Sequence, residues 1–274
     1  LSVLQEAADA GDPESQLILG KLFLEGDGVE RDAAKAAEWF VKAAAAEDGG
    51  AASTQSQYNL GMLLLSGEGV KEDSEQGVFY LEQAAVGGMP MAQYFLGMMY
   101  LQADGVPQDM EKATEFLGSA AEQGIADAQY TIGIMLLDTP PQATEEKSWA
   151  AHWLNKAAEQ GDSRGQLAIG RMFMFGVGME RDMEKAANWV SAAAGAGEVD
   201  AQYIMGTMLL AGDGVEQNYE WAAHWFEQAA NQGNVDAQYN LALMYESGDG
   251  VPEDKEKADF WFKQAAEKGD EEAA

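Results

Sequence analysis

The sequence predicts an all-α fold, a right-handed αα-superhelix (solenoid) of about seven helix-turn-helix repeats. Three observations lead to this expectation. A glutamine that precedes tyrosine or leucine recurs every 36, 37 or 41 residues, a pair such as Leu-Gly follows three residues later, and most units then contain a glycine-rich turn. Such self-similarity is typical of stacked repeats, because one unit cannot bury its apolar face alone. The glutamines are Gln16, Gln57, Gln93, Gln129, Gln166, Gln202 and Gln238.

The first half of each repeat has apolar residues at helical spacing. In the third repeat, Ala92, Leu96 and Tyr100 are four residues apart and therefore share one face of a helix. Gly97 follows the leucine, and a residue without a side chain lets a neighbouring helix come close. We expect a helix here that packs against the second half of its own repeat.

The turn and the second half of the repeat also have helix signals. Strings such as GDGVERD, ADGVPQD and GDGVPED supply glycines that adopt positive φ angles and reverse the chain. The turn closes on a residue such as Asp182, which suits the N-cap of the next helix. That helix, MEKAANWVSAAA from Met183, has an aromatic residue at Trp189 and ends in alanines. We expect it to form the other half of the repeat's core.

The repeats imply a single array over residues 1–274. Residues 1–11 match the end of a second helix, and full repeats start near 12, 53, 89, 125, 162, 198 and 234. The chain thus begins and ends within a unit, whereas terminal repeats usually have a polar outer face. We expect a segment excised from a longer protein, with a native chain whose ends fray as the alternative.

These motifs together resemble the Sel-1-like repeat family, a relative of the tetratricopeptide repeats. The resemblance covers essentially the whole chain, and it implies an adaptor or scaffold protein, many of which are bacterial. Some relatives are cysteine-rich, and this chain departs from them because it has no cysteine. In the third repeat the matching residues are Ala92, Leu96, Gly97, Tyr100, Gly105, Val106, Lys112, Ala113 and Phe116.

The charge of the chain narrows the class of partner. With 47 acidic and 16 basic residues the net charge is −31, which disfavours nucleic acid and anionic membrane surfaces. It would steer a basic protein or peptide toward the chain, although the acidity could also serve solubility alone. We expect no membrane insertion, because the sequence has no apolar run of about 18 residues. No targeting segment is visible, and bacterial periplasm, secretion and cytoplasm stay open, as does the oligomeric state.

The candidate partner-binding surface follows from numbering each first helix from its alanine as zero. Positions three and six point away from the packed side, position seven lies at its margin, and all three are unusually apolar. In related solenoids the first helices line the concave face, so we expect a groove there, with packing between first helices as the alternative. The candidate residues are Asn59, Met62, Phe95, Met98, Met99, Thr131, Ile134, Met135, Arg171, Ile204, Thr207, Asn240 and Leu243.

Other features depart from the repeat pattern. An insertion over residues 43–57 and the string DTPPQATEEK over residues 138–147 could be contact points or neutral surface loops. Trp149 and Trp221 lie where other repeats have lysine, four residues before the repeat tryptophan. They could form an aromatic patch on the second helices, although partial burial as packing residues is the favoured interpretation.

The sequence predicts no enzyme. The two histidines, His152 and His224, occupy equivalent positions two repeats apart, about 20 Å by repeat geometry, which is too far for a shared metal. No cofactor motif and no arrangement of nucleophile and base is recognisable. We therefore expect a protein–protein interaction module that binds a partner on its concave face. The alternatives are an inhibitor or immunity-type protein that masks a basic partner and, more distantly, a cell-wall hydrolase or glycan binder.

Overall fold

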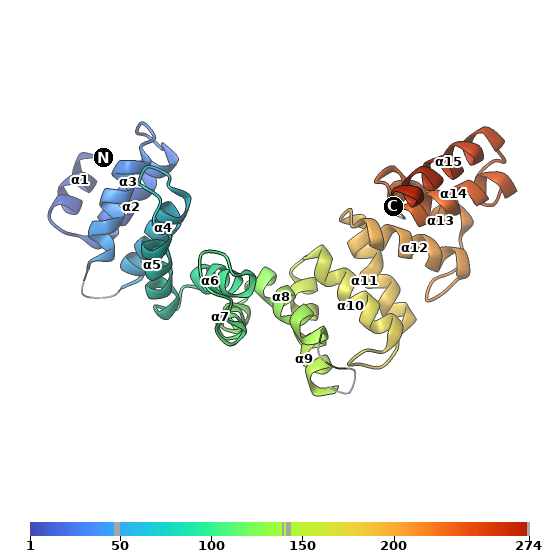
Figure 1. Ribbon diagram of the computed structural model, residues 1–274, viewed down its shortest axis with the longest axis horizontal. Coiled ribbons are helices and arrows are strands. Elements are labelled where there is room, and N and C mark those ends of the chain that lie inside the picture. The colour runs from blue at the N-terminus through green and yellow to red at the C-terminus, as the bar shows by residue number, and fades with distance from the viewer. Residues whose placement is uncertain (47–49, 139, 141–143, 273–274) are drawn as a thin grey trace. The chain divides into compact units, whose positions relative to one another are not determined.

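A computed structural model describes residues 1–46, 50–138, 140 and 144–272 of the chain (Figure 1). Within these residues it contains fifteen helices and no strand, which confirms the predicted all-α solenoid class. The helices are α1 (Ser2–Asp9), α2 (Pro13–Glu25), α3 (Ala33–Ala44), α4 (Ala51–Ser66), α5 (Ser74–Val86), α6 (Pro90–Gln102), α7 (Met110–Glu122), α8 (Ala126–Leu137), α9 (Thr144–Glu159), α10 (Ser163–Phe175), α11 (Met183–Gly195), α12 (Val199–Ala211), α13 (Tyr219–Asn231), α14 (Val235–Ser247) and α15 (Lys255–Glu272).

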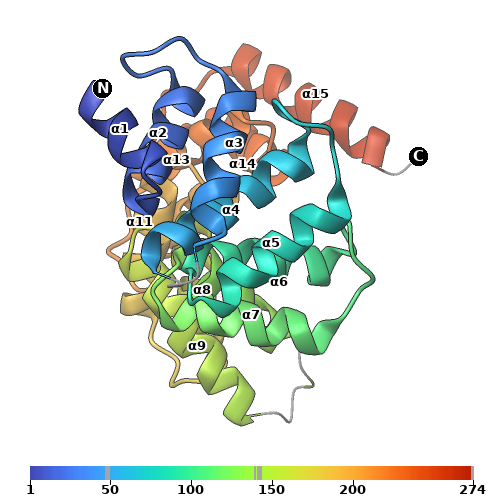
Figure 2. The same cartoon turned by 90° about the vertical axis from the view of Figure 1, so that its left-hand side faces the viewer.

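The chain forms two compact units, Leu1–Ala128 and Gln129–Ala274. In the first unit, helices α2, α4 and α6 each pack on the helix that follows, and α3 and α5 pack on the next repeat. Figure 2 shows α3, α4 and α5 side by side in chain order. The second unit repeats this order from α9 to α15. Within each unit, consecutive repeats thus share core, as nearest-neighbour stacking requires.

Glycine at position five of the first helix permits this close packing. A Cβ atom added at Gly206 of α12 would lie 2.7 Å from the ring of Phe226 in α13. Phe226 is fully buried, so its ring has no free space into which to move. The glycine that the sequence marks in this position is therefore needed for the contact between the two helices of one repeat.

The turn after the first helix needs its glycines for two different reasons. The first glycine, such as Gly248, ends the helix in the left-handed conformation with φ of 79°. The third repeat has Ala103 in that place with φ of 59°, a conformation that is costly for alanine. The second glycine approaches the preceding repeat, since a Cβ added at Gly250 would lie 2.3 Å from the backbone of Tyr219.

The aspartates that close the turns are the N-caps predicted from the sequence. The Asp182 carboxylate accepts a hydrogen bond of 3.0 Å from the backbone N–H of Lys185. This N–H group belongs to the first turn of α11, where no helical carbonyl is available to it. Hydrogen bonds from Lys185 hold the pKa of Asp182 below its usual value.

The repeated glutamine joins three helices. The buried Gln202 of α12 donates from Nε2 to the carbonyl oxygen of Ala194 in α11, at 3.3 Å. Its Oε1 accepts a hydrogen bond of 2.8 Å from Nε2 of Gln232, which follows α13. The sequence showed this glutamine only as a marker of the repeat, whereas the structure gives it a role in joining consecutive repeats.

The two irregular connections are described only in part. Residues 47–49 of the first insertion, and residues 139 and 141–143 of the proline-containing string, lie outside the described residues. The described end of the insertion lengthens α4, which begins at Ala51 and places Ser53 and Ser56 in the core. The expectation that these connections contact a partner stays a prediction.

Candidate partner-binding surface

The first helices bury one side and leave a second side partly open. In α6 the buried residues include Ala92, Leu96, Gly97 and Tyr100, the positions whose spacing predicted the packed face. Positions three and six, Phe95 and Met98 in this helix, are half-buried. A half-buried apolar side chain keeps area that a partner can cover while its base packs against the neighbouring helix. These two positions therefore form what we term the first-helix face.

The candidate residues at positions three and six all retain exposed area. Ile134 and Leu243 are 37% and 38% exposed, and Arg171 is also exposed. The half-buried members are Asn59, Met62, Phe95, Met98, Thr131, Ile204, Thr207 and Asn240. The face belongs to α4 and α6 in the first unit and to α10, α12 and α14 in the second, with α8 crossing the unit boundary.

Position seven lies in the core in most repeats. Met99 is 9% exposed, and Met172, Met208 and Met244 are 3%, 2% and 4% exposed. Met135 is half-buried. Packing between helices buries position seven. Met99 therefore packs beneath the first-helix face and contributes little exposed area to it.

In the first unit the first-helix face is aromatic. The ring of Phe95 in α6 lies 5.5 Å from that of Tyr94 and 6.2 Å from that of Tyr58 in α4, measured between centroids. Burial raises the pKa of the Tyr58 hydroxyl. The sequence reasoning missed both tyrosines, although the tyrosine after the repeat glutamine was a visible signal. A shallow depression of about 320 Å³ between α2 and α4 lies on the same unit and is lined by Ile18, Lys21 and Gln55.

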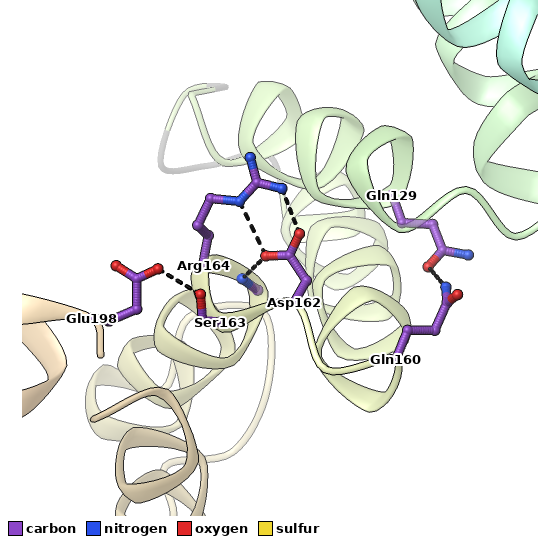
Figure 3. Close-up of polar contacts among 7 residues, drawn as sticks. Gln129, Gln160, Asp162, Ser163, Arg164 and Glu198 are labelled. Atoms are coloured by element: carbon purple, nitrogen blue, oxygen red, sulfur yellow. Dashed lines mark hydrogen bonds and ion pairs between the residues drawn. The ribbon is translucent and has the colours of Figure 1, made fainter. Parts of the chain in front are cut away.

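In the second unit, polar contacts gather at the start of α10 (Figure 3). Arg164 of α10 pairs with Asp162 and lies 4.5 Å from the centroid of the Tyr130 ring. Burial raises the pKa of Asp162, but the hydrogen bonds from Arg164 and Gly165 outweigh it and hold this pKa below its usual value. Arg171 donates to Asp200 of α12 at 2.8 Å. Both arginines are thus engaged by carboxylates of the chain itself.

The second helices of this unit expose tryptophan. Trp149 in α9 and Trp221 in α13 are 51% and 54% exposed, more than the favoured packing interpretation implied. His152 stacks edge-on against Trp149, and His224 does so against Trp221, with centroids 5.5 and 5.2 Å apart. Within the described residues no three potential metal ligands cluster, and both histidines lie in these exposed aromatic groups. In the described part of the chain, no helix is both long and apolar enough to cross a bilayer.

The Sel1 repeat matches seven consecutive segments, residues 13–48, 54–88, 90–125, 126–162, 163–198, 199–234 and 235–270. Two solved structures share this organisation. A protective antigen present in uropathogenic Escherichia coli strains, which displays an SLR fold, is 33% identical with a TM-score of 0.86. A Sel1 repeat protein from Oxalobacter formigenes is 37% identical with a TM-score of 0.71.

These matches cover nearly all of this chain but a smaller share of each solved structure. Each match covers 98% of this chain, but it covers 56% of the E. coli antigen and 76% of the Oxalobacter protein. This chain therefore spans little more than half the length of the antigen. No curated protein matches it. The seven matched segments and the two structures show that the chain belongs to the Sel1 repeat family.

Proposed function

We propose that this chain is a protein–protein interaction module whose first-helix face binds a segment of a partner protein. Sel1 repeat proteins generally act through such interactions, and the repeat is typically a non-catalytic module. The observation that supports this assignment is the cluster of Tyr58, Tyr94 and Phe95 beside the half-buried Met62 and Met98. Aromatic residues and methionine are enriched in the centres of protein interfaces.

The chemistry of this surface defines the partner segment. An apolar anchor would bury against the rings of α4 and α6, and flanking basic residues would suit a chain of net charge −31. The face of the second unit fits such an anchor less well, because Arg171 at position six of α10 is charged and paired with Asp200. The first unit is therefore the proposed site of contact.

Peptide selection tests the proposal. A displayed library of random dodecamers would be selected on the immobilised chain, and enriched peptides measured by calorimetry. Phe95→Ala and Met98→Ala are each expected to lower the affinity for the enriched peptides about tenfold, because truncating a residue at the centre of an interface has an effect of this size. Leu243→Ala is the matched control, because this residue is 38% exposed on the first-helix face of the other unit. Circular dichroism would show that each variant remains folded.

The outcomes separate the candidate functions. Enriched peptides that bind the Phe95 and Met98 variants as tightly as the unchanged chain would refute the first-helix face as the site. Peptides that are basic throughout, bind by charge and ignore both variants would instead favour the inhibitor or immunity-type alternative. Binding of a muramyl peptide with no enriched sequence would favour the glycan alternative.

A further inference from the structure

A second surface lies on α13, on the helix opposite the first-helix face within its repeat. Trp221 occupies what we term the lysine position, four residues before the repeat aromatic residue of the second helix. Trp221 is 54% exposed. Burying a tryptophan would be favourable, so an indole left half in water is a candidate contact. Lysine occupies the equivalent position as Lys35, Lys112, Lys185 and Lys257.

In the repeats that have this lysine, its ammonium group lies over an aromatic ring. The ring belongs to position eight of the first helix in the same repeat, 4.7 to 5.5 Å from the nitrogen. The remaining repeats have leucine at position eight, Leu209 in the repeat of Trp221. In this repeat an aromatic ring therefore replaces the lysine, and leucine replaces the ring at position eight. The four pairs are Lys35 with Phe23, Lys112 with Tyr100, Lys185 with Phe173, and Lys257 with Tyr245.

The acidic residue that pairs with the lysine is also replaced in the repeat of Trp221. Lys185 pairs with the N-cap Asp182 at 3.2 Å, and Lys257 pairs with Asp254 at 3.8 Å. The N-cap before Trp221 is the neutral Asn218, which still accepts the capping hydrogen bond at 3.0 Å. The helix start is preserved, while both members of the ion pair are replaced by uncharged residues.

This repeat has no cation of its own to cover the ring. Residues 199–234 contain no lysine and no arginine. Glu220 and Glu227 are exposed on α13, and the acidic turn of the next repeat packs against the start of this helix, because Gly250 lies against the backbone of Tyr219. In the described residues the lysines and the arginine that lie over rings are all near other aromatic side chains. The acidic residues of this repeat are Asp200, Asp213, Glu216, Glu220 and Glu227.

We propose that the exposed face of α13 formed by Trp221 and His224 docks an arginine-containing segment of a partner protein. A guanidinium group would stack on the Trp221 indole, and Glu220 and Glu227 would supply the opposite charge. Arginine fits better than lysine because its planar group stacks and is more weakly hydrated. This surface is separate from the first-helix face, and its existence does not depend on that proposal.

Trp149 offers an internal comparison. It shows the same edge-on histidine contact, but α9 contains Lys147 and Lys156, and Lys156 lies 5.3 Å from the Trp153 ring centroid. These lysines lower the local negative charge, so we expect an arginine segment to prefer Trp221. A titration that compares the two indoles therefore tests the role of charge at nearly constant ring geometry.

Nuclear magnetic resonance can observe this preference directly. The chain has seven tryptophans, and each indole N–H gives one signal in a ¹⁵N-labelled sample. Replacement by phenylalanine, one tryptophan at a time, would assign the signals of Trp149 and Trp221. The probe is a glycine-serine dodecamer with three arginines, titrated at low salt, and its control is the same peptide with citrulline for arginine. We expect the arginine peptide to shift the Trp221 signal most and the citrulline peptide to have little effect.

Variants then test the site by isothermal titration calorimetry with the same arginine peptide. The double variant Asn218→Asp, Trp221→Lys recreates the pair of the lysine repeats, and its affinity for the peptide should fall roughly fivefold or more. Phe175→Ala is the matched control, since it removes a 71% exposed ring elsewhere in the same unit. Phe95→Ala, on the first-helix face, should leave this binding unchanged. Raising the salt concentration to 150 mM should weaken it.

Several results would overturn the proposal. Equal shifts with the citrulline peptide would mean that the ring binds without selecting a cation. An unchanged affinity in the double variant would place the peptide elsewhere, and loss of binding in Phe95→Ala would assign it to the first-helix face. Shifts of Trp221 by a chito-oligosaccharide, with none by the arginine peptide, would make the surface a glycan contact instead.

Discussion

The repeat glutamine Gln166 lacks one of the hydrogen bonds that Gln93 and Gln202 make, and a single substitution should supply it. Gln93 accepts a hydrogen bond from Gln123 at 2.7 Å and Gln202 accepts one from Gln232 at 2.8 Å, and the donor lies 30 positions later in each case. Thirty residues after Gln166 the chain has Ala196. Within the described residues, Oε1 of Gln166 is buried without a hydrogen-bond partner. We predict that Ala196→Gln supplies the missing donor.

The structure sets the size of the effect. A buried acceptor without a partner costs about 1–3 kcal/mol, and ordering a new glutamine side chain costs about 1 kcal/mol. The backbone is compatible, because Ala196 has φ of −79° and ψ of −6°, close to the −86° and 0° of Gln232. The free energy of unfolding should therefore rise by about 1 kcal/mol.

Urea denaturation of a double-mutant cycle checks this reasoning. Ala196→Gln would be measured alone and in the background of Gln166→Met, which removes the acceptor but keeps an unbranched side chain of similar length. Gln202→Met is the matched comparison, because Gln202 makes both hydrogen bonds whereas Gln166 makes one, to Ala158 at 3.3 Å. If Ala196→Gln raised the free energy of unfolding equally with Gln166 and with Gln166→Met, the gain would come from helix propensity and the proposed hydrogen bond would be refuted. Equal losses in the two methionine variants would refute it as well.

Three further predictions concern the turns, the caps and the helix contact. Ala103→Gly should stabilise the chain by about 0.5–1 kcal/mol in urea denaturation, and Gly248→Ala should destabilise it by about 1 kcal/mol, because the two residues adopt the left-handed conformation with φ of 59° and 79°. The Asp182 carboxylate should lose its stabilising effect as the pH falls below about 4, since its pKa is lower in the folded than in the unfolded chain, and an Asp182→Asn variant should show a smaller acid-induced loss. Gly206→Ala should lower the free energy of unfolding by about 1–3 kcal/mol, because the added methyl group overpacks against Phe226. Urea denaturation should show a lower midpoint, and an unchanged midpoint would mean that α12 and α13 move apart without cost.

The sequence was informative about the surface only up to a point. Positions three and six of the first helix were predicted to retain exposed area, and they do, as Ile134 and Leu243 show most clearly. Position seven directly follows position six in the chain, yet Met99 at position seven of α6 is buried. A rotation of a few tens of degrees about the helix axis separates these outcomes, and that rotation depends on how the next helix packs. The contact of these residues with a partner stays a prediction.

By itself the sequence determined the repeat, the helices and their caps, because those signals act over a few residues. Glycine at positive φ, aspartate at an N-cap and apolar residues four apart have the same effect in any surroundings. Only the tertiary structure decided what joins the repeats and which rings stay exposed. The hydrogen bond between Gln202 and Gln232 joins residues 30 positions apart in the chain, and the 54% exposure of Trp221 depends on how α13 packs against its neighbours. Such contacts depend on how the helices stack in space, and no local pattern specifies that arrangement.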